Sequence, residues 1–149
     1  MIEMYLEFEG IVGSESRKGV KDALPVLAWS WGLSGSPTRH PNVQDLSVTL
    51  WMDAAATGLA RAITEHSSGK ARLSCFRPRD EEHPLYRYEL EGAAVTSLSM
   101  GGSGGEDRFT LNTSITFKAI SMQINLLDAE GRTTPEFASA QVEVHDSRW

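Results

Sequence analysis

The fold is decided by residues 86–126, which read YRYELEGAAVTSLSMGGSGGEDRFTLNTSITFKAISMQINL. Apolar residues recur at every second position on both sides of a glycine-rich segment, and this is the period of β-strands. Gly92 predicts a bend inside the first strand, and 101–107 predicts a turn. The apolar side changes from odd to even positions near Ala119, which predicts a β-bulge. The whole stretch therefore predicts consecutive strands with no helix between them.

The same alternation marks the chain before this stretch. Period two over 2–8, 26–33 and 46–52 predicts three further strands. The polar segments 13–23 and 34–41 contain glycine or proline and predict loops between those strands. The first third of the chain is therefore also expected to be mainly β.

One helix is expected, between Asp53 and Gly69. Asp53 is a good N-cap and Gly69 is suited to a C-terminal stop. Between them Leu59, Ala60 and Ile63 form a narrow apolar stripe, which predicts that one side of the helix docks on the rest of the protein.

These segments, with short strands expected at 71–76 and 140–144, amount to seven or eight strands and one helix. The order shows no alternation of strand and helix, so a parallel sheet is not expected. The predicted class is mainly β: an antiparallel two-sheet sandwich or barrel with one helix against its side or mouth. Residues 1–149 show no internal repeat and no linker, which predicts a single domain.

Composition excludes several classes of function. Lys and Arg number 14 and Asp and Glu number 20, so the net charge is −6 and the basic surface of a nucleic-acid-binding domain is not expected. No apolar run approaches the ~18 residues of a membrane span, and the first residues lack a signal-peptide pattern. We therefore expect assembly in the cytoplasm and no membrane insertion. The lone Cys75 excludes an intrachain disulfide and a multi-cysteine metal site, and its place in a strand predicts a core residue.

Enzymatic signals are weak. Residues 101–105 formally match the nucleophile elbow G-x-S-x-G, but that motif requires a strand-to-helix turn, and strands are expected on both sides of this one. The histidines lie singly and without metal-ligand spacing, at His40, His66, His83 and His145. The sequence predicts no catalytic residue, no metal and no organic cofactor.

Ser30 lies between two tryptophans in the strand expected at 26–33. The large rings of Trp29 and Trp31 favour core packing, although a ligand pocket built from tryptophans is the alternative. Neighbouring residues of a strand point to opposite faces. Ser30 is therefore predicted to face away from the core.

Several segments, together spanning about residues 4–131, resemble one protein family. They are Gly10–Ser16, Val26–Gly32, Asn42–Ser47, the helix beginning at Asp53, and Gly101–Arg108 leading into Ser114–Phe117. Their content and order are similar to those of the hemolysin-coregulated protein (Hcp) family, the inner-tube subunit of bacterial type VI secretion systems. Residues 134–149 differ from the usual ending of that family and are interpreted as a variable tail.

The resemblance implies a two-sheet β-barrel with a flanking helix, six copies of which close into a ring. Rings would stack into a tube inside a contractile sheath, and contraction would expel the tube together with spike and effector proteins. This implies secretion without a signal peptide, with effectors carried in the lumen of the ring.

The resemblance also suggests roles for particular residues. Ser30 would line the lumen, the alternatives being a contact between protomers or bulk solvent. A ring or stacking interface would use one loop, whose alternative is a plain hairpin turn: Gly101, Gly102, Ser103, Gly104, Gly105, Glu106, Asp107 and Arg108.

Two other functions fit the sequence. A tail-tube protein of a phage-like contractile particle would share the fold and would be distinguished by its genomic neighbours. A monomeric small-ligand β-barrel would use the tryptophans as a pocket and would have the mass of one chain, 16.4 kDa, in solution.

Overall fold

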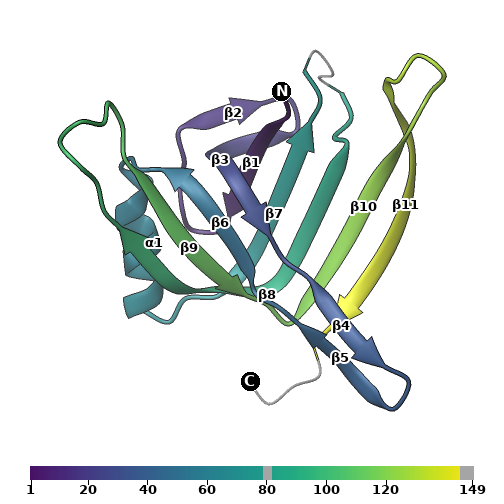
Figure 1. The fold of residues 1–149 in the computed structure, drawn as a ribbon, viewed down its shortest axis with the longest axis horizontal. Coiled ribbons are helices and arrows are strands. Elements are labelled where there is room, and N and C mark those ends of the chain that lie inside the picture. The colour runs from purple at the N-terminus through teal and green to yellow at the C-terminus, as the bar shows by residue number, and fades with distance from the viewer. Residues whose placement is uncertain (79–81, 145–149) are drawn as a thin grey trace.

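The computed structural model describes residues 1–78 and 82–144, and in this part it contains eleven strands and one helix (Figure 1). The strands are β1 (Glu3–Phe8), β2 (Glu15–Arg17), β3 (Val20–Ser30), β4 (Leu33–Ser36), β5 (Arg39–Val43), β6 (Leu46–Trp51), β7 (Gly69–Phe76), β8 (Tyr86–Met100), β9 (Thr110–Thr116), β10 (Ala119–Leu127) and β11 (Thr133–Glu143). The helix is α1 (Ala55–Thr64). His145 and the last residues of the expected tail lie outside the described residues.

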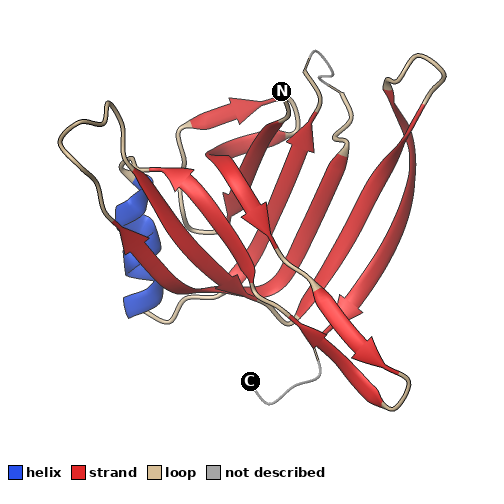
Figure 2. Cartoon of the chain, in the orientation of Figure 1, coloured by secondary structure: helices blue, strands red, loops and turns tan. Residues whose placement is uncertain are grey.

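Six strands close into an antiparallel barrel in the order β8-β7-β1-β3-β6-β9, with β9 returning to β8. Three smaller pieces are attached to it: β10 and β11 extend the sheet from β8, β2 pairs with β3, and β4 and β5 form a separate two-stranded ribbon. The predicted class, a mainly β barrel with one helix at its side, is confirmed (Figure 2).

The long strand β8 takes part in both the barrel and its extension. Its first half pairs with β10 and its second half pairs with β9 along the same edge. Gly92 separates the halves at φ +60°, and the backbone amide of Lys118 donates to the carbonyl of Glu91 at the same level. The bend predicted at Gly92 is therefore confirmed. The β-bulge predicted near Ala119 is wrong, because the parity changes there at the break between two strands, β9 and β10.

The core lies inside the barrel. Alternate residues of the six strands fill it, and the largest fully buried ones include Leu6, Leu46, Val48, Leu50, Leu73, Leu90, Leu111 and Ile115. Each such side chain contributes roughly 1.5–3 kcal/mol by leaving water. Cys75 belongs to this core at 1% exposure, as predicted, and burial raises the pKa of its thiol to about 11.

The helix is shorter than predicted. Its last residue is Thr64, and His66 adopts the left-handed conformation, at φ +53°, that was expected of a glycine. Gly69 instead begins β7. Asp53 does serve the first turn, because its Oδ1 accepts a hydrogen bond from the amide of Ala55 at 2.8 Å. Docking of one side of the helix is confirmed, since Leu59 is fully buried and Ile63 packs against the core. Ala60 is only half-buried, and the rest of the buried side is Ala55, Ala56 and Ala62.

Two expected loops are strands. Segment 13–23 contains β2 and the start of β3, joined by a turn at Gly19 with φ +81°, and Val20 packs beneath this hairpin. Segment 34–41 belongs largely to β4 and β5. Most side chains of β2, β4 and β5 are exposed. Alternation was invisible because it arises only when one face of a strand is buried.

Exposure on both faces also explains why the full length of the C-terminal strand was not predicted. The short strand expected at 140–144 is the end of β11, an eleven-residue strand that pairs with β10. Most of its side chains are exposed on both faces. Eleven strands therefore replace the predicted seven or eight.

Within the described ranges, the molecule contains no helix with the length and apolar character that crossing a bilayer would require.

Candidate functional site

Ser30 ends β3 on the outer surface of the barrel, with its side chain turned away from the core. A register shift between Val26 and Ala28 sets this direction. Val26 is buried and Leu27 is 39% exposed, so Leu27 faces outward although it lies two residues before Trp29. Beyond the shift, Trp29 packs against the core and Ser30 points outward as predicted.

Two cross-strand rows of small side chains surround Ser30. They follow directly from the pairing of β3 with β6, β6 with β9, and β9 with β8. One row is Ser30, Ser47, Ser114 and Ser97, and the other is Ala28, Thr49, Asn112 and Ser99. We call these eight residues the serine face.

The serine face is a shallow, open hollow of about 470 Å³. It carries hydroxyl and amide groups and no charge, and one cross-strand hydrogen bond runs from Thr49 Oγ1 to Asn112 Oδ1 at 2.8 Å. Sequence analysis identified Ser30 alone. The sequence shows that Ser47 and Thr49 alternate with apolar residues in the strand expected at 46–52. It does not show which strands are neighbours, and the two rows exist only through that pairing.

The tryptophans beneath Ser30 are used for packing. The rings of Trp29 and Trp31 contact the ring of Tyr88 with centroids 5.0 and 6.1 Å apart. Trp29 Nε1 also donates to the sulfur of Met4 at 3.2 Å. Core packing is therefore confirmed for both tryptophans, and this weighs against the tryptophan-lined ligand pocket.

The glycine-rich loop, 101–109, joins the end of β8 to the start of β9 and is exposed throughout. None of the glycines of this loop has a positive φ. Gly102 is required for another reason: a Cβ there would lie 2.6 Å from the ring of Phe109. At the end of the loop the Arg108 guanidinium stacks over Trp51 at 4.7 Å.

The formal G-x-S-x-G match in this loop joins two strands and so lacks the strand-to-helix turn of a nucleophile elbow. Among residues 1–78 and 82–144, no three His, Cys, Asp or Glu side chains are placed to hold a metal ion.

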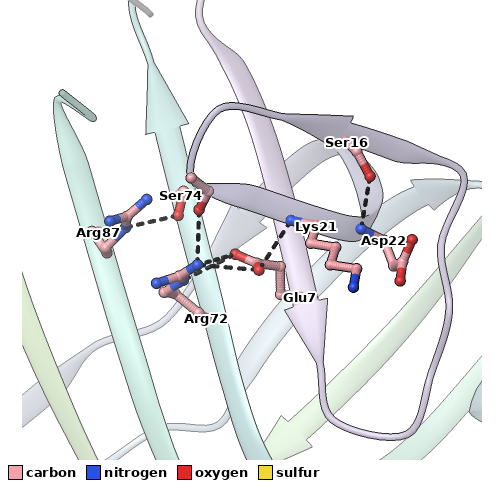
Figure 3. Close-up of polar contacts among 8 residues, drawn as sticks. Glu7, Ser16, Lys21, Asp22, Arg72, Ser74 and Arg87 are labelled. Carbon is pink, nitrogen blue, oxygen red and sulfur yellow. Dashed lines mark hydrogen bonds and ion pairs between the residues drawn. The ribbon is translucent and has the colours of Figure 1, made fainter. Parts of the chain in front are cut away.

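The barrel surface formed by β1, β7 and the first half of β8 has the opposite chemistry (Figure 3). Arg72 donates from Nε and Nη2 to the carboxylate of Glu7, at 2.9 and 3.1 Å, and from Nη2 to the carbonyl of Gly19 at 2.9 Å. Arg87 Nε donates to Ser74 at 3.0 Å, and burial together with the nearby Arg72 lowers the pKa of Arg87. We call this surface the charged face.

The two faces lie on different parts of the barrel wall. The serine face is carried by β3, β6, β9 and the second half of β8, and the charged face by β1, β7 and the first half of β8. The charged face was not predicted from the sequence, because its partners Glu7 and Arg72 are 65 residues apart. The loop 101–109 is separate from Ser30 and begins where the β8 residues of the serine face end.

Several solved structures of type VI secretion system proteins share this fold. A structure described as a type six secretion system protein matches with a TM-score of 0.86 and 20% identity, covering 97% of this chain and 96% of the other. A type VI secretion system effector from Yersinia pestis matches at 0.79 and 20%, covering 95% and 99%. Hcp1 from Salmonella typhimurium matches at 0.78 and 19%, covering 95% and 94%. These likenesses define the fold class of this protein, a β-barrel of the architecture that these type VI secretion proteins share.

Sequence comparison gives the family. A family model described as "Type VI secretion system effector, Hcp" matches residues 5–124. Protein hcp1 of Pseudomonas aeruginosa is 33% identical over 144 aligned residues, covering 87% of each chain. The chain belongs to the Hcp family of type VI secretion system proteins, a family of structural secretion proteins and not of enzymes.

Proposed function

We propose that this protein is the subunit of a secretion tube, in which six copies close into a ring and rings stack end to end. Membership of the Hcp family supports a tube-forming role. The proposal includes assembly in the cytoplasm, contact with sheath and spike proteins, and release without a cleaved signal peptide. It treats residues 1–149 as one tube domain with a variable tail from residue 134.

The observation that carries the proposal is the contrast between the serine face and the charged face. A channel that passes folded proteins of differing charge works best with a wall of small, neutral, hydrated side chains, because such a wall neither traps nor repels its contents. The serine face has this chemistry over four neighbouring strands. Ser30 and its rows would therefore line the lumen, with the charged face turned outward.

The assembly is tested by the solution mass of the purified protein at micromolar concentration. The proposal expects about six times the 16.4 kDa of one chain. A protein that stays at the mass of one chain at every concentration tried would refute the ring.

The lumen role of Ser30 is tested with Ser30→Gln. A modest polar side chain fits a wide aqueous channel, so the ring should persist while co-purification of a lumen-carried effector falls. Gln44→Ser is a control polar exchange at an exposed site off the serine face. Loss of the ring by folded Ser30→Gln would instead place Ser30 in a contact between subunits.

The loop role is tested by reversing the charge of Asp107, an exposed residue of the loop. Asp107→Lys should weaken ring or tube formation in a chain that still folds. Unchanged assembly would favour a plain hairpin turn for residues 101–108.

A further inference from the structure

The sheet extension carries an apolar patch that the barrel does not cover. In the register of β8, β10 and β11, paired residues share a face, so one face is continuous with the inward side of Tyr88. Its members are Tyr86, Met122, Ile124, Ala138, Ala140 and Val142. None is charged, and we call this set the extension patch.

Exposure of the extension patch increases away from the barrel. Met122 and Val142 still pack against the edge of the core, whereas Ile124 is 36% exposed and Ala138 and Ala140 are exposed. The barrel closes through β9, so no strand of the described chain lies across from this part of the sheet. The apolar side of the sheet that faces the core within the barrel is therefore exposed to solvent in the extension.

The middle of the outer edge of the extension is also unprotected. Among the described strands β11 pairs with β10 alone. Pro135 and Glu136 lie near its start and Glu143 at its end, but the run Phe137–Val142 between them contains neither a charge nor a proline, the devices by which natural proteins protect an edge strand. A long edge of this kind next to an apolar patch is typical of a surface that a specific partner covers.

A second apolar patch lies on the opposite flank of the molecule. Met100 is 53% exposed and Phe109 is 40% exposed, and these two residues bracket the glycine-rich loop 101–108. Figure 1 shows this loop and α1 on one side of the barrel and β10 with β11 on the other. We call Met100 and Phe109 the loop patch.

We propose that the extension patch of one copy packs against the loop patch of the next copy. A second copy is the occupant because the same chain presents an exposed apolar patch on each of two opposite flanks, so that one contact between two copies covers both kinds of patch. Contacts between two different patches are heterologous and repeat until a ring closes. The inference rests on the proposed ring, and it assigns loop 101–108 to contacts within a ring and not between stacked rings.

The test uses one substitution in each patch. Ala140→Arg places a charge on the extension patch, and Met100→Arg places one on the loop patch. Gln141→Arg is the matched control, because this exposed residue is next to Ala140 on the opposite face of β11. The expected solution mass is that of one chain for the first two variants, a sixfold loss, and that of the intact ring for the control.

Mixing the two disabled variants gives the decisive result. Ala140→Arg keeps a functional loop patch and Met100→Arg keeps a functional extension patch, so an equimolar mixture should form a two-chain species that neither variant forms alone. Circular dichroism verifies folding, and Ala138→Arg on the same face replaces Ala140→Arg if that variant is unfolded.

The outcomes separate the two proposals. A wild-type protein with the mass of one chain overturns the ring and this inference together. Two results overturn the inference alone when the wild type forms a ring. One is an intact ring formed by folded Ala140→Arg or Met100→Arg, and the other is a mixture of the two variants that remains at one-chain mass.

Discussion

Ser30 and Trp29 are adjacent in β3, yet one meets solvent and the other packs against the core. A strand separates its neighbours in this way by geometry alone, so the identity of each residue tells which surface it serves. The register shift at Leu27 shows the limit of this reasoning. Alternation of inward and outward side chains, starting from Trp29, places Ser30 correctly but places Leu27 on the wrong face. The register shift between Val26 and Ala28 causes this, and such a shift cannot be recognised in the sequence of one strand.

Cys75 makes stability depend on pH. Its pKa in the folded protein is about 11, above the ordinary value of 9.0, because burial disfavours the thiolate. Below pH 9.0 the thiol keeps its proton in both the folded and the unfolded protein, and the stabilising contribution of the buried thiol is fully present. As pH rises from 9 towards 11 only the unfolded chain loses the proton, so the free energy of unfolding falls by up to about 1.4 kcal/mol per pH unit.

Urea denaturation of the wild type and of Cys75→Ala, at about pH 8 and about pH 10, measures this effect, because the variant lacks the titrating group. The stability difference between the two proteins should shrink at the higher pH. An equal difference at both pH values would contradict a raised pKa of the buried thiol.

At the scale of elements, β8 determines the architecture by bending at Gly92. The sequence predicted this strand, its bend, β1, β6, β7 and the turn after Met100, because each has one buried face or a glycine at a required position. It did not predict β2, β4, β5 or the full length of β11. These strands are largely exposed on both faces, so their residues carry no alternating pattern.

Gly92→Ala should destabilise the protein by about 1–2 kcal/mol. The left-handed backbone at φ +60° disfavours a side chain, and the added Cβ would lie 2.9 Å from the Lys118 side chain. Gly101→Ala is the control, since nothing lies within 4 Å of its Cβ position and its φ is not positive. Chemical denaturation measures both variants, and equal stability of the two would argue against a strained bend.

Glu7→Gln tests the charged face. The pair of Glu7 and Arg72 is double and partly shielded from water, with side chains 20% and 32% exposed, so its loss should cost about 1 kcal/mol after allowing for screening. The exposed pair of Lys18 and Glu82, at 72% and 68%, provides the control, and Glu82→Gln should leave the unfolding midpoint unchanged. Comparable effects of the two substitutions would show that burial of the Glu7 pair is unimportant.

At the scale of the whole molecule, one barrel presents four surfaces of different kinds: the serine face, the charged face, the extension patch and the loop patch. Ser30 and the loop were visible in the sequence. The rows around Ser30, the pairing of Glu7 with Arg72 and the shared face of Ile124 and Ala138 were not, because each depends on strands brought together from distant parts of the chain.

The central claim is that copies of this barrel form a ring whose channel wall is the serine face. A cryo-electron microscopy reconstruction of the purified assembly tests it most directly, because it locates each β-strand relative to the ring axis. The account predicts a six-membered ring with Ser30, Ser47, Ser97 and Ser114 on the channel wall and Glu7 with Arg72 on the outside. A ring with the charged face on the channel wall, or particles of a single chain, would contradict it.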